Sequence, residues 1–259
     1  MSELDFHKVD VILPIMVTTK NSIGTFRIGL ILVDGFALMS YSSIVEPLRA
    51  ANLISRRTYY DIKYIPVTGS WAHSSSGASV KATGRIGQEG DFDLVLVVAG
   101  GHPASFTDTK LFQWLRTLSR RGVNLGGVSG GPVILASAGV MEGRRMTVHW
   151  EHAAALAESR TGLMIERSLY VIDRDRFTCA GGIAPLDMMH ALLTEHHGPA
   201  FARQVSDWFM HTDVRSASGP QRSGSVSYTH LRAHETLRYL VCRLQLDKQT
   251  GGGEGGGGG

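Results

Sequence analysis

Apolar runs of strand length recur along the chain and alternate with stretches of helix length. Three of these runs, residues 28–33, 93–99 and 123–128, contain few polar side chains, which is typical of strands buried on both faces of a parallel sheet. A helical pattern follows each run, as in the crossover units of parallel sheets. The sequence therefore predicts an α/β fold with a doubly wound, mostly parallel sheet and helices on both faces.

The first helix is expected over about residues 43–53. Ser43 and Glu46 have the spacing of a capping box there, and Pro47 would lie in the first turn, where proline is tolerated. The other helices are expected over residues 110–120, 132–141, 150–158, 185–194 and 200–210. Further strands are expected over residues 60–67, 78–85, 163–166, 169–172 and 176–179, with a Gly/Ser-rich turn over 69–77 between the first two.

Composition changes at both ends of this alternating region. We expect residues 1–25 to be a loosely attached extension and residues 26–212 to form the domain. Residues 213–225 hold Arg, Ser, Gly and Pro with almost no apolar side chains, which is typical of a linker. Residues 226–259 end in glycines that cannot build a core, and we expect them to be a non-native tail resembling adapter read-through.

Composition excludes several classes of protein. With 259 residues, 43% of them hydrophobic, the chain can bury a core and is not disordered throughout. The net charge of +3 is too balanced to indicate nucleic-acid binding. Two cysteines, Cys179 and Cys242, make no disulfide framework and favour a cytoplasmic location, and Cys179 is expected to be an inert core thiol. No run reaches the roughly 18 apolar residues of a membrane span, so no membrane partner is expected.

The sharpest local motif is Gly127-Val128-Ser129-Gly130-Gly131, a G-x-S-x-G between a predicted strand and a predicted helix. A strained turn of this kind exposes its central side chain and directs backbone N–H groups at an anion or a carbonyl oxygen. A second turn, Gly100-Gly101-His102, follows the neighbouring strand, and parallel sheets bind ligands at the carboxyl ends of their strands. We expect both turns to face one crevice. Alternatively, the glycines serve tight packing alone, and His102 is a solvated loop histidine.

His149 is the candidate partner of Ser129, as a base for a nucleophile or as a donor to a ligand. It could equally be a helix-start histidine bonded to the backbone. An α/β-hydrolase places an acid between its serine and its histidine, and only Glu142 lies between these two. A hydrolase is therefore the weaker interpretation.

Two histidine pairs are candidate metal ligands. His149 with His152, and His196 with His197, have close spacing but lack the cysteine or carboxylate neighbours of a typical metal site. No bound metal is therefore expected.

Several motifs in a fixed order carry a family resemblance: Leu32-Val33-Asp34-Gly35-Phe36, Glu46-Pro47-Leu48-Arg49-Ala50-Ala51-Asn52, Gly100-Gly101, the G-x-S-x-G, Leu135-Ala136-Ser137-Ala138-Gly139, Gly143-Arg144-Arg145-Met146-Thr147-Val148-His149-Trp150, Cys179-Ala180-Gly181-Gly182 and His197-Gly198-Pro199-Ala200. On these motifs, residues 27–222 resemble the sensor domain of GlxA-type AraC-family transcriptional regulators. This is a branch of the DJ/PfpI superfamily with the flavodoxin-like, class I glutamine-amidotransferase-like fold.

The departures from that pattern bear on catalysis. The superfamily's enzymes place a cysteine nucleophile where this chain has Ser129, and often a histidine or threonine where it has Gly130. Their early acidic residue falls near Ala37, or on Ser40 in isonitrile-hydratase-like members. A serine without an adjacent base is a weak nucleophile. The resemblance thus implies a crevice that has lost its catalytic groups.

The sequence therefore predicts a catalytically inactive, ligand-sensing domain of a transcription regulator of amino-acid or quaternary-amine catabolism. The ligand is expected to be a small polar metabolite, betaine-like or carnitine-like, without a cofactor. The domain is expected to be a homodimer that meets DNA only through a helix-turn-helix domain absent from this chain. The alternative is a serine-dependent hydrolase or amidase using Ser129 and His149. The expected ligand-binding residues are Ser40, Glu46, Gly100, Gly101, His102, Ser129, Gly130 and His149.

Overall fold

A computed structural model describes residues 24–88 and 90–223 of the chain. Most of the expected extension, residues 1–23, lies outside the described residues, as does the whole expected tail, residues 226–259. The described residues up to Gln221 belong to one compact unit. None of the helices in these two described ranges has the length and apolar character needed to cross a bilayer.

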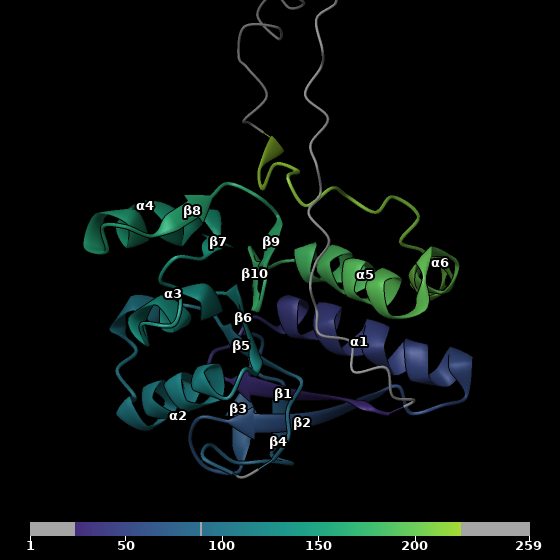
Figure 1. The fold of residues 1–259 in the computed structure, drawn as a ribbon, viewed down its shortest axis with the longest axis horizontal. Helices are drawn as coiled ribbons and strands as arrows, with labels where there is room; N and C mark the ends of the chain where they lie inside the picture. Colours follow the sequence, from purple (N-terminus) through teal and green to yellow (C-terminus); the bar gives the residue numbers. More distant parts are fainter. Residues whose placement is uncertain (1–23, 89, 224–259) are drawn as a thin grey trace, which may run out of the picture. The chain divides into compact units, whose positions relative to one another are not determined.

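A six-stranded sheet forms the centre of the domain (Figure 1). Its neighbouring strands pair in parallel, except for the last two, which are antiparallel. This arrangement confirms the predicted mostly parallel sheet. In spatial order the strands are β2 (Tyr60–Pro66), β1 (Phe26–Leu32), β5 (Leu94–Ala99), β6 (Asn124–Ser129), β10 (Arg176–Cys179) and β9 (Tyr170–Asp173).

Helices cover both faces of the sheet, which confirms the doubly wound architecture. One face packs against α1 (Leu38–Ser55), α5 (Ala184–His197) and α6 (Pro199–Trp208). The other packs against α2 (Thr109–Arg120) and α3 (Gly131–Ser137), with α4 (Trp150–Ser159) adding Leu156 to the same cluster. A short 3₁₀ turn, η1 (Pro103–Ser105), follows β5.

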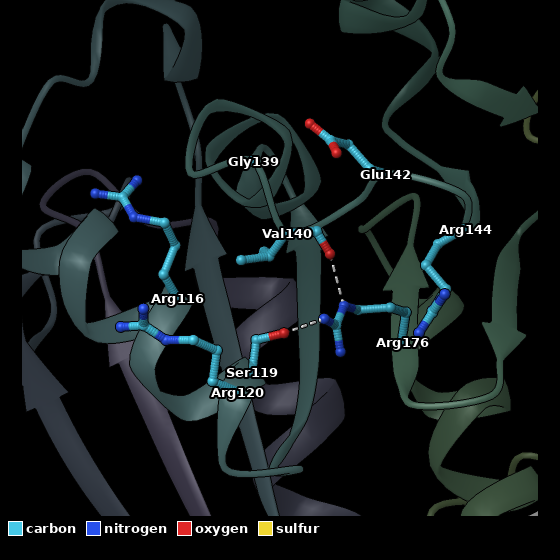
Figure 2. Close-up of a pocket in the computed structure, with 8 residues that line it drawn as sticks. All are labelled: Arg116, Ser119, Arg120, Gly139, Val140, Glu142, Arg144 and Arg176. Carbon is cyan, nitrogen blue, oxygen red and sulfur yellow. Dashed lines mark hydrogen bonds between the residues drawn. The ribbon is translucent and has the colours of Figure 1, made fainter.

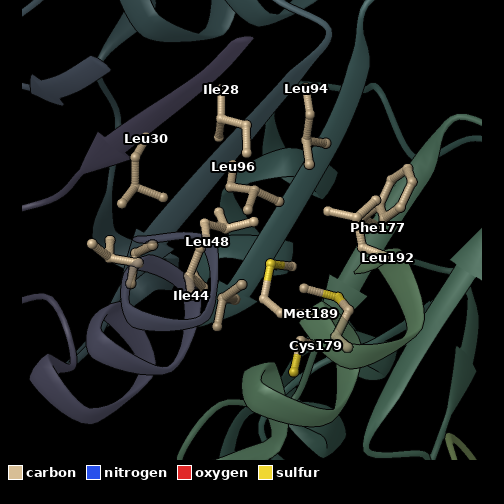
Figure 3. Close-up of a cluster of buried hydrophobic side chains, with 14 of the residues drawn as sticks. Ile28, Leu30, Ile44, Leu48, Leu94, Leu96, Phe177, Cys179, Met189 and Leu192 are labelled. Carbon is tan, nitrogen blue, oxygen red and sulfur yellow. The ribbon is translucent and has the colours of Figure 1, made fainter. Parts of the chain in front are cut away.

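Two apolar cores lie on opposite faces of the sheet because successive side chains of a strand alternate between its faces. In β1, Leu30 points into the core beneath α1 and α5, and Ile31 points into the core beneath α2 and α3. Figure 3 shows the first core, where Leu48 of α1 and Met189 of α5 gather beneath Leu96 of β5. All of these side chains are fully buried. Each contributes about 1.5–3 kcal/mol by leaving water.

The start of α1 differs from the capping-box prediction. The helix begins at Leu38, with Ala37 as an extended residue that makes no side-chain cap, and Ser43 is buried within the helix. Pro47 therefore lies inside the helix, where its missing N–H leaves one turn without a hydrogen bond. The prediction was wrong because Leu38 and Tyr41 pack against the core, and this contact extends the helix beyond the local signal.

Two small sheets were only partly expected. β3 (Trp71–His73) pairs with β4 (Ser79–Lys81), and β7 (Arg145–Thr147) pairs with β8 (Met164–Glu166). The Gly/Ser-rich stretch 69–77 was predicted as a turn, but β3 lies within it. Only Ala72 of β3 is buried, and one buried residue in three is too short a pattern to reveal a strand.

The segment that follows α6, expected as a linker from residue 213, is held against the domain as far as Gln221. Arg215 donates to the carboxylate of Asp187, a fully buried residue of α5, with an N–O distance of 2.6 Å. The backbone N–H of Leu169 donates to Ala217 at 2.8 Å. The amide of Gln221 donates to the Ser168 carbonyl at 2.8 Å. These contacts fix the segment although it has few apolar side chains.

Candidate functional site

Ser129 ends β6 in a left-handed backbone conformation, with φ of +60°. This conformation costs a non-glycine residue about 1–3 kcal/mol and persists only when the surroundings enforce it. A Cβ on Gly127 would lie 2.5 Å from the Gly131 carbonyl carbon, and one on Gly181 would lie 2.8 Å from Cβ of Ser129. The glycines therefore do serve tight packing, and that packing holds Ser129 in its strained turn.

His149 meets Ser129 through the backbone, because its N–H lies 3.5 Å from the Ser129 carbonyl oxygen. The His149 ring instead caps α4, where Nδ1 accepts from the Glu151 N–H at 3.4 Å. The His149 ring is thus committed to the helix cap, and no hydrogen bond joins it to the Ser129 hydroxyl. The structure thus brings the two predicted residues together without forming the nucleophile–base pair of a hydrolase.

Ser40 lies in the first turn of α1 and is fully buried. Its hydroxyl finds no partner in the described part of the chain. A buried hydroxyl left unpaired costs about 1–3 kcal/mol. The loop that leads into α1 packs tightly on the turn Gly100-Gly101-His102 that follows β5, called the β5 turn below. A Cβ on Gly100 would lie 2.6 Å from the Gly35 carbonyl oxygen.

A cavity of about 420 Å³ opens at the carboxyl ends of β1 and β5. Of the predicted ligand-binding residues, Gly100, Gly101 and His102 line it. Pro103 also lines the cavity and separates it from the turn Gly127–Gly131, called the elbow below. A Cβ on Gly130 of the elbow would lie 2.9 Å from the Pro103 ring. The elbow residues and the β5 turn are therefore neighbours, but the cavity takes in only the β5 turn.

Sequence reasoning missed five polar residues of this cavity, Asp34, Thr68, Ser105, Thr107 and Asp108. Asp34 accepts from the His73 N–H at 2.9 Å, and Asp108 caps α2 by accepting from the Leu111 N–H at 2.8 Å. Asp34 directly follows a predicted strand, so its place at this edge could have been inferred. Asp108 could not, because its position depends on how the chain after η1 folds back.

Glu46 lies apart from the other predicted residues. It forms an ion pair of 2.6 Å with Arg49 on the surface of α1, about 9 Å along the helix axis from Ser40. Burial raises the pKa of Tyr64 in β2, and the charge of Glu46 raises it further. The side chain of Glu46 therefore lies beside the β2 edge of the sheet.

Three side chains at the start of α4 converge. The potential ligand atoms of His149, Glu151 and His152 all lie within 4.8 Å of one another. Burial lowers the pKa of His152, repulsion from His149 and His102 lowers it further, and Glu151 acts in the opposite direction. The premise that this histidine pair lacks a carboxylate neighbour was wrong, because Glu151 lies in the same turn.

The other histidine pair, His196 and His197, lies at the opposite ends of the strands, beside Tyr60. His196 Nδ1 and His197 Nε2 bond the hydroxyl of Tyr60, at 2.9 and 3.0 Å. Burial lowers the pKa of His196 to about 4. Burial also raises the pKa of the Cys179 thiol to about 12, in agreement with an inert core thiol.

A second hollow, of about 300 Å³, lies at the amino ends of the strands and is lined by four arginines (Figure 2). Arg176 is buried and donates to the Val140 carbonyl and the Ser119 hydroxyl. Figure 2 shows that Arg116 and Arg120 extend away from Arg176. The guanidinium groups do not converge on one point, so we assign this hollow a structural role.

The chain is similar to known regulators along most of its length. A family model described as the DJ-1/PfpI family matches residues 26–195. The HTH-type transcriptional regulator GlxA of Rhizobium meliloti (strain 1021) is 44% identical over 231 residues, covering 89% of this chain and 71% of that protein. The HTH-type transcriptional regulator CdhR of Pseudomonas aeruginosa is 41% identical over 192 residues, and the match spans 57% of its length.

A solved structure has the same fold. The AraC family transcriptional regulator from Pseudomonas putida superimposes with a TM-score of 0.64 at 24% sequence identity, covering 71% of this chain and 99% of that one. At this identity the likeness supports the fold and leaves the ligand open.

Proposed function

The chain belongs to the DJ-1/PfpI family, and from that premise we propose that its domain senses a small polar metabolite without transforming it. The observation that carries the proposal is the strained elbow, where Ser129 replaces the family's nucleophile and no described side chain serves it as a base. Two relatives are named as transcriptional regulators, which supports a role in transcription regulation.

The lining of the 420 Å³ cavity supports a cationic or zwitterionic ligand. Two carboxylates, Asp34 and Asp108, line it, and neither lysine nor arginine does. Each carboxylate gives one oxygen to a backbone N–H and keeps the other for a ligand. Phe106 adds an aromatic side chain of the kind that attracts a quaternary ammonium group. A betaine-like, carnitine-like or amino-acid ligand fits this chemistry.

The proposed contacts come from two neighbouring groups of residues. Gly100, Gly101 and His102 line the cavity, while Ser129, Gly130 and His149 lie beyond Pro103. The buried hydroxyl of Ser40 remains in the proposal as a group that lacks a partner. Glu46, already paired with Arg49, is the weakest member of the expected set.

A thermal-shift screen of the full chain tests the proposal. Glycine betaine, carnitine and free amino acids are compared with neutral analogues of similar size, because a ligand that binds only the folded state raises Tm. We expect one charged class to raise Tm and Asp34→Asn to reduce that rise. Lys110→Gln, an exposed change outside the cavity, is the matched control.

The alternative function, a serine-dependent hydrolase or amidase, gives the opposite result in a turnover assay. Steady hydrolysis of an ester or amide that disappears in Ser129→Ala would establish the alternative and refute the sensor. We expect no turnover in either protein.

The proposal extends to assembly and location. We propose that the active regulator is a cytoplasmic homodimer that contacts DNA through a helix-turn-helix module. The names of its relatives support the helix-turn-helix module. Light scattering at micromolar concentration tests the dimer, and a monomeric mass would contradict it.

A further inference from the structure

The start of α4 places three metal-ligating side chains on one helical turn. His149 caps the helix, Glu151 lies in its first turn and His152 follows directly. Their potential ligand atoms lie within 4.8 Å of one another, and the two imidazole ring centroids are 5.8 Å apart. Ligand atoms around a four-coordinate zinc ion, bound at 2.0–2.1 Å, are about 3.3 Å apart. The ligand atoms therefore need to approach one another by up to about 1.5 Å to reach the spacing of a zinc site.

These three side chains make few other hydrogen bonds that stabilise the fold. His149 Nδ1 accepts one long hydrogen bond, 3.4 Å from the Glu151 nitrogen, and lies 3.8 Å from the Glu151 carboxylate. The Glu151 side chain is 66% exposed and is free to turn. Within the described ranges, the contacts of His152 are its ring contact with His149 and its charge interactions. A metal ion would thus replace no strong bond of the fold.

From this geometry we infer that His149, Glu151 and His152 bind a divalent transition metal, with Zn²⁺ as the ion they fit best. Two imidazoles and one carboxylate select zinc and its neighbours over Mg²⁺ and Ca²⁺, which prefer oxygen ligands. Three protein ligands leave a fourth coordination position open, as in zinc sites of the His₂Glu type.

The site lies next to the elbow, because the His149 N–H is 3.5 Å from the Ser129 carbonyl oxygen. His102 of the β5 turn is close enough for its charge to act on His152. A metal ion held by α4 would therefore lie near the turn that contains Ser129. The inference shares His149 with the proposed metabolite site but does not depend on a metabolite.

Metal titration of the full chain tests the inference. After treatment with EDTA and buffer exchange, the protein is titrated with Zn²⁺ against a chromophoric chelator, and with Co²⁺ while visible absorption is recorded. We expect one equivalent of Zn²⁺ to bind with micromolar or lower Kd. Co²⁺ should give visible bands of the intensity that four-coordinate cobalt shows. His149→Gln, Glu151→Gln and His152→Gln should each weaken binding at least tenfold.

Two controls separate this site from other histidines. His73→Gln removes an exposed histidine of β3 and should leave the affinity unchanged. His230 and His234, outside the described residues, are four positions apart, and replacing both should also leave one equivalent bound. Circular dichroism checks that every variant is folded. The inference is overturned if the three variants at α4 bind as tightly as the parent chain, or if only the double replacement abolishes binding.

The same proteins distinguish this inference from the proposed function. The metabolite screen is repeated in EDTA with the parent chain and with His152→Gln. A Tm rise that survives in both, together with absent Zn²⁺ binding, refutes the metal site and leaves the sensor intact. Zn²⁺ binding without any metabolite shift supports the metal site and counts against the sensor.

Discussion

Buried polar groups differ between the amino ends of the strands, called the amino edge below, and their carboxyl ends, called the carboxyl edge. At the amino ends of the strands, the buried Arg176 and the half-buried His196 are bonded to protein partners. At the carboxyl ends, the buried hydroxyl of Ser40 has no partner among the described residues. Each edge carries a hollow of a few hundred Å³, so volume alone does not separate them. Satisfied polar groups stabilise a fold, whereas unsatisfied ones are available to a ligand.

Backbone geometry does not divide the two ends in this way, because Arg56 and Arg174, which precede β2 and β10, also have positive φ. Ser129 at the carboxyl edge adopts a positive φ that glycine would adopt at lower cost. Strain of this kind persists where function maintains it. The comparison therefore predicts that substitutions at the amino edge destabilise the protein and that selected substitutions at the carboxyl edge stabilise it.

The largest effect is expected for Arg176→Met at the amino edge. Removing the guanidinium leaves the Val140 carbonyl and the Asp175 carboxylate without their buried donor. Each buried group left without its donor costs about 1–3 kcal/mol, while Asp175 keeps its ion pair with Arg144 at 2.8 Å. Urea unfolding measures the change. Arg120→Met, in the same hollow but exposed and bonded only to Thr117, should stay within about 0.5 kcal/mol, and equal losses would contradict the comparison.

Acid sensitivity gives the next effect, through His196. Its folded pKa of about 4 lies below the unfolded value of 6.5, so between these pH values the unfolded chain binds a proton that the folded chain does not. The stability contributed by neutral His196 is complete above pH 6.5. It falls by about 3 kcal/mol as the pH drops to 4.

Unfolding free energies measured from pH 8 to pH 4 test this origin. His196→Gln should reduce the slope, because glutamine does not titrate there. A smaller slope should remain, since burial also lowers the pKa of His152, His190 and His197. An unchanged slope in His196→Gln would assign the acid loss to other groups.

At the carboxyl edge, Ser129→Gly should stabilise the protein by about 1 kcal/mol. Glycine adopts positive φ without strain, although its greater freedom in the unfolded chain offsets part of the gain. Ser137→Gly at the end of α3 is the matched control and should destabilise by about 0.5 kcal/mol, because its position is helical. If Ser129→Gly proves destabilising, the elbow is not strained.

The smallest effect is expected for Ser40→Ala. Removing a buried hydroxyl that has no partner should raise stability by up to about 1 kcal/mol. The contrasting change is Ser206→Ala, since Ser206 is also buried but bonds His190 at 2.8 Å. Its loss should cost about 1 kcal/mol by urea unfolding. Two changes of the same sign would contradict the distinction between buried hydroxyls with and without a partner.

The sheet and the elbow were predictable because both depend on local pattern. Continuous apolar runs predicted β1, β5 and β6, and glycines on both sides of Ser129 predicted the turn. The start of α1 was not predictable, since the burial of Leu38 and Tyr41 outweighs the capping signal at Ser43.

The candidate site was only partly predictable for a similar reason. Sequence placed both glycine turns at one edge, but no local pattern reveals that Pro103 separates the cavity from Ser129. Asp108 reaches the cavity only because the chain returns there after η1. The carboxylate beside His149 and His152 was visible in the sequence, since Glu151 lies between them.

The ion pair between Arg215 and Asp187 determines the fraction of molecules in which the segment after α6 is detached from the domain. Asp187 is fully buried and also accepts from the His211 ring at 2.9 Å. Exposing a buried charged group by removing its partner costs about 3 kcal/mol or more, which corresponds to fewer than about one molecule in a hundred. Nearly every molecule in a population thus holds residues 211–215 in one position on α5. The first residues of α5 follow Gly181, which packs against Ser129 of the elbow.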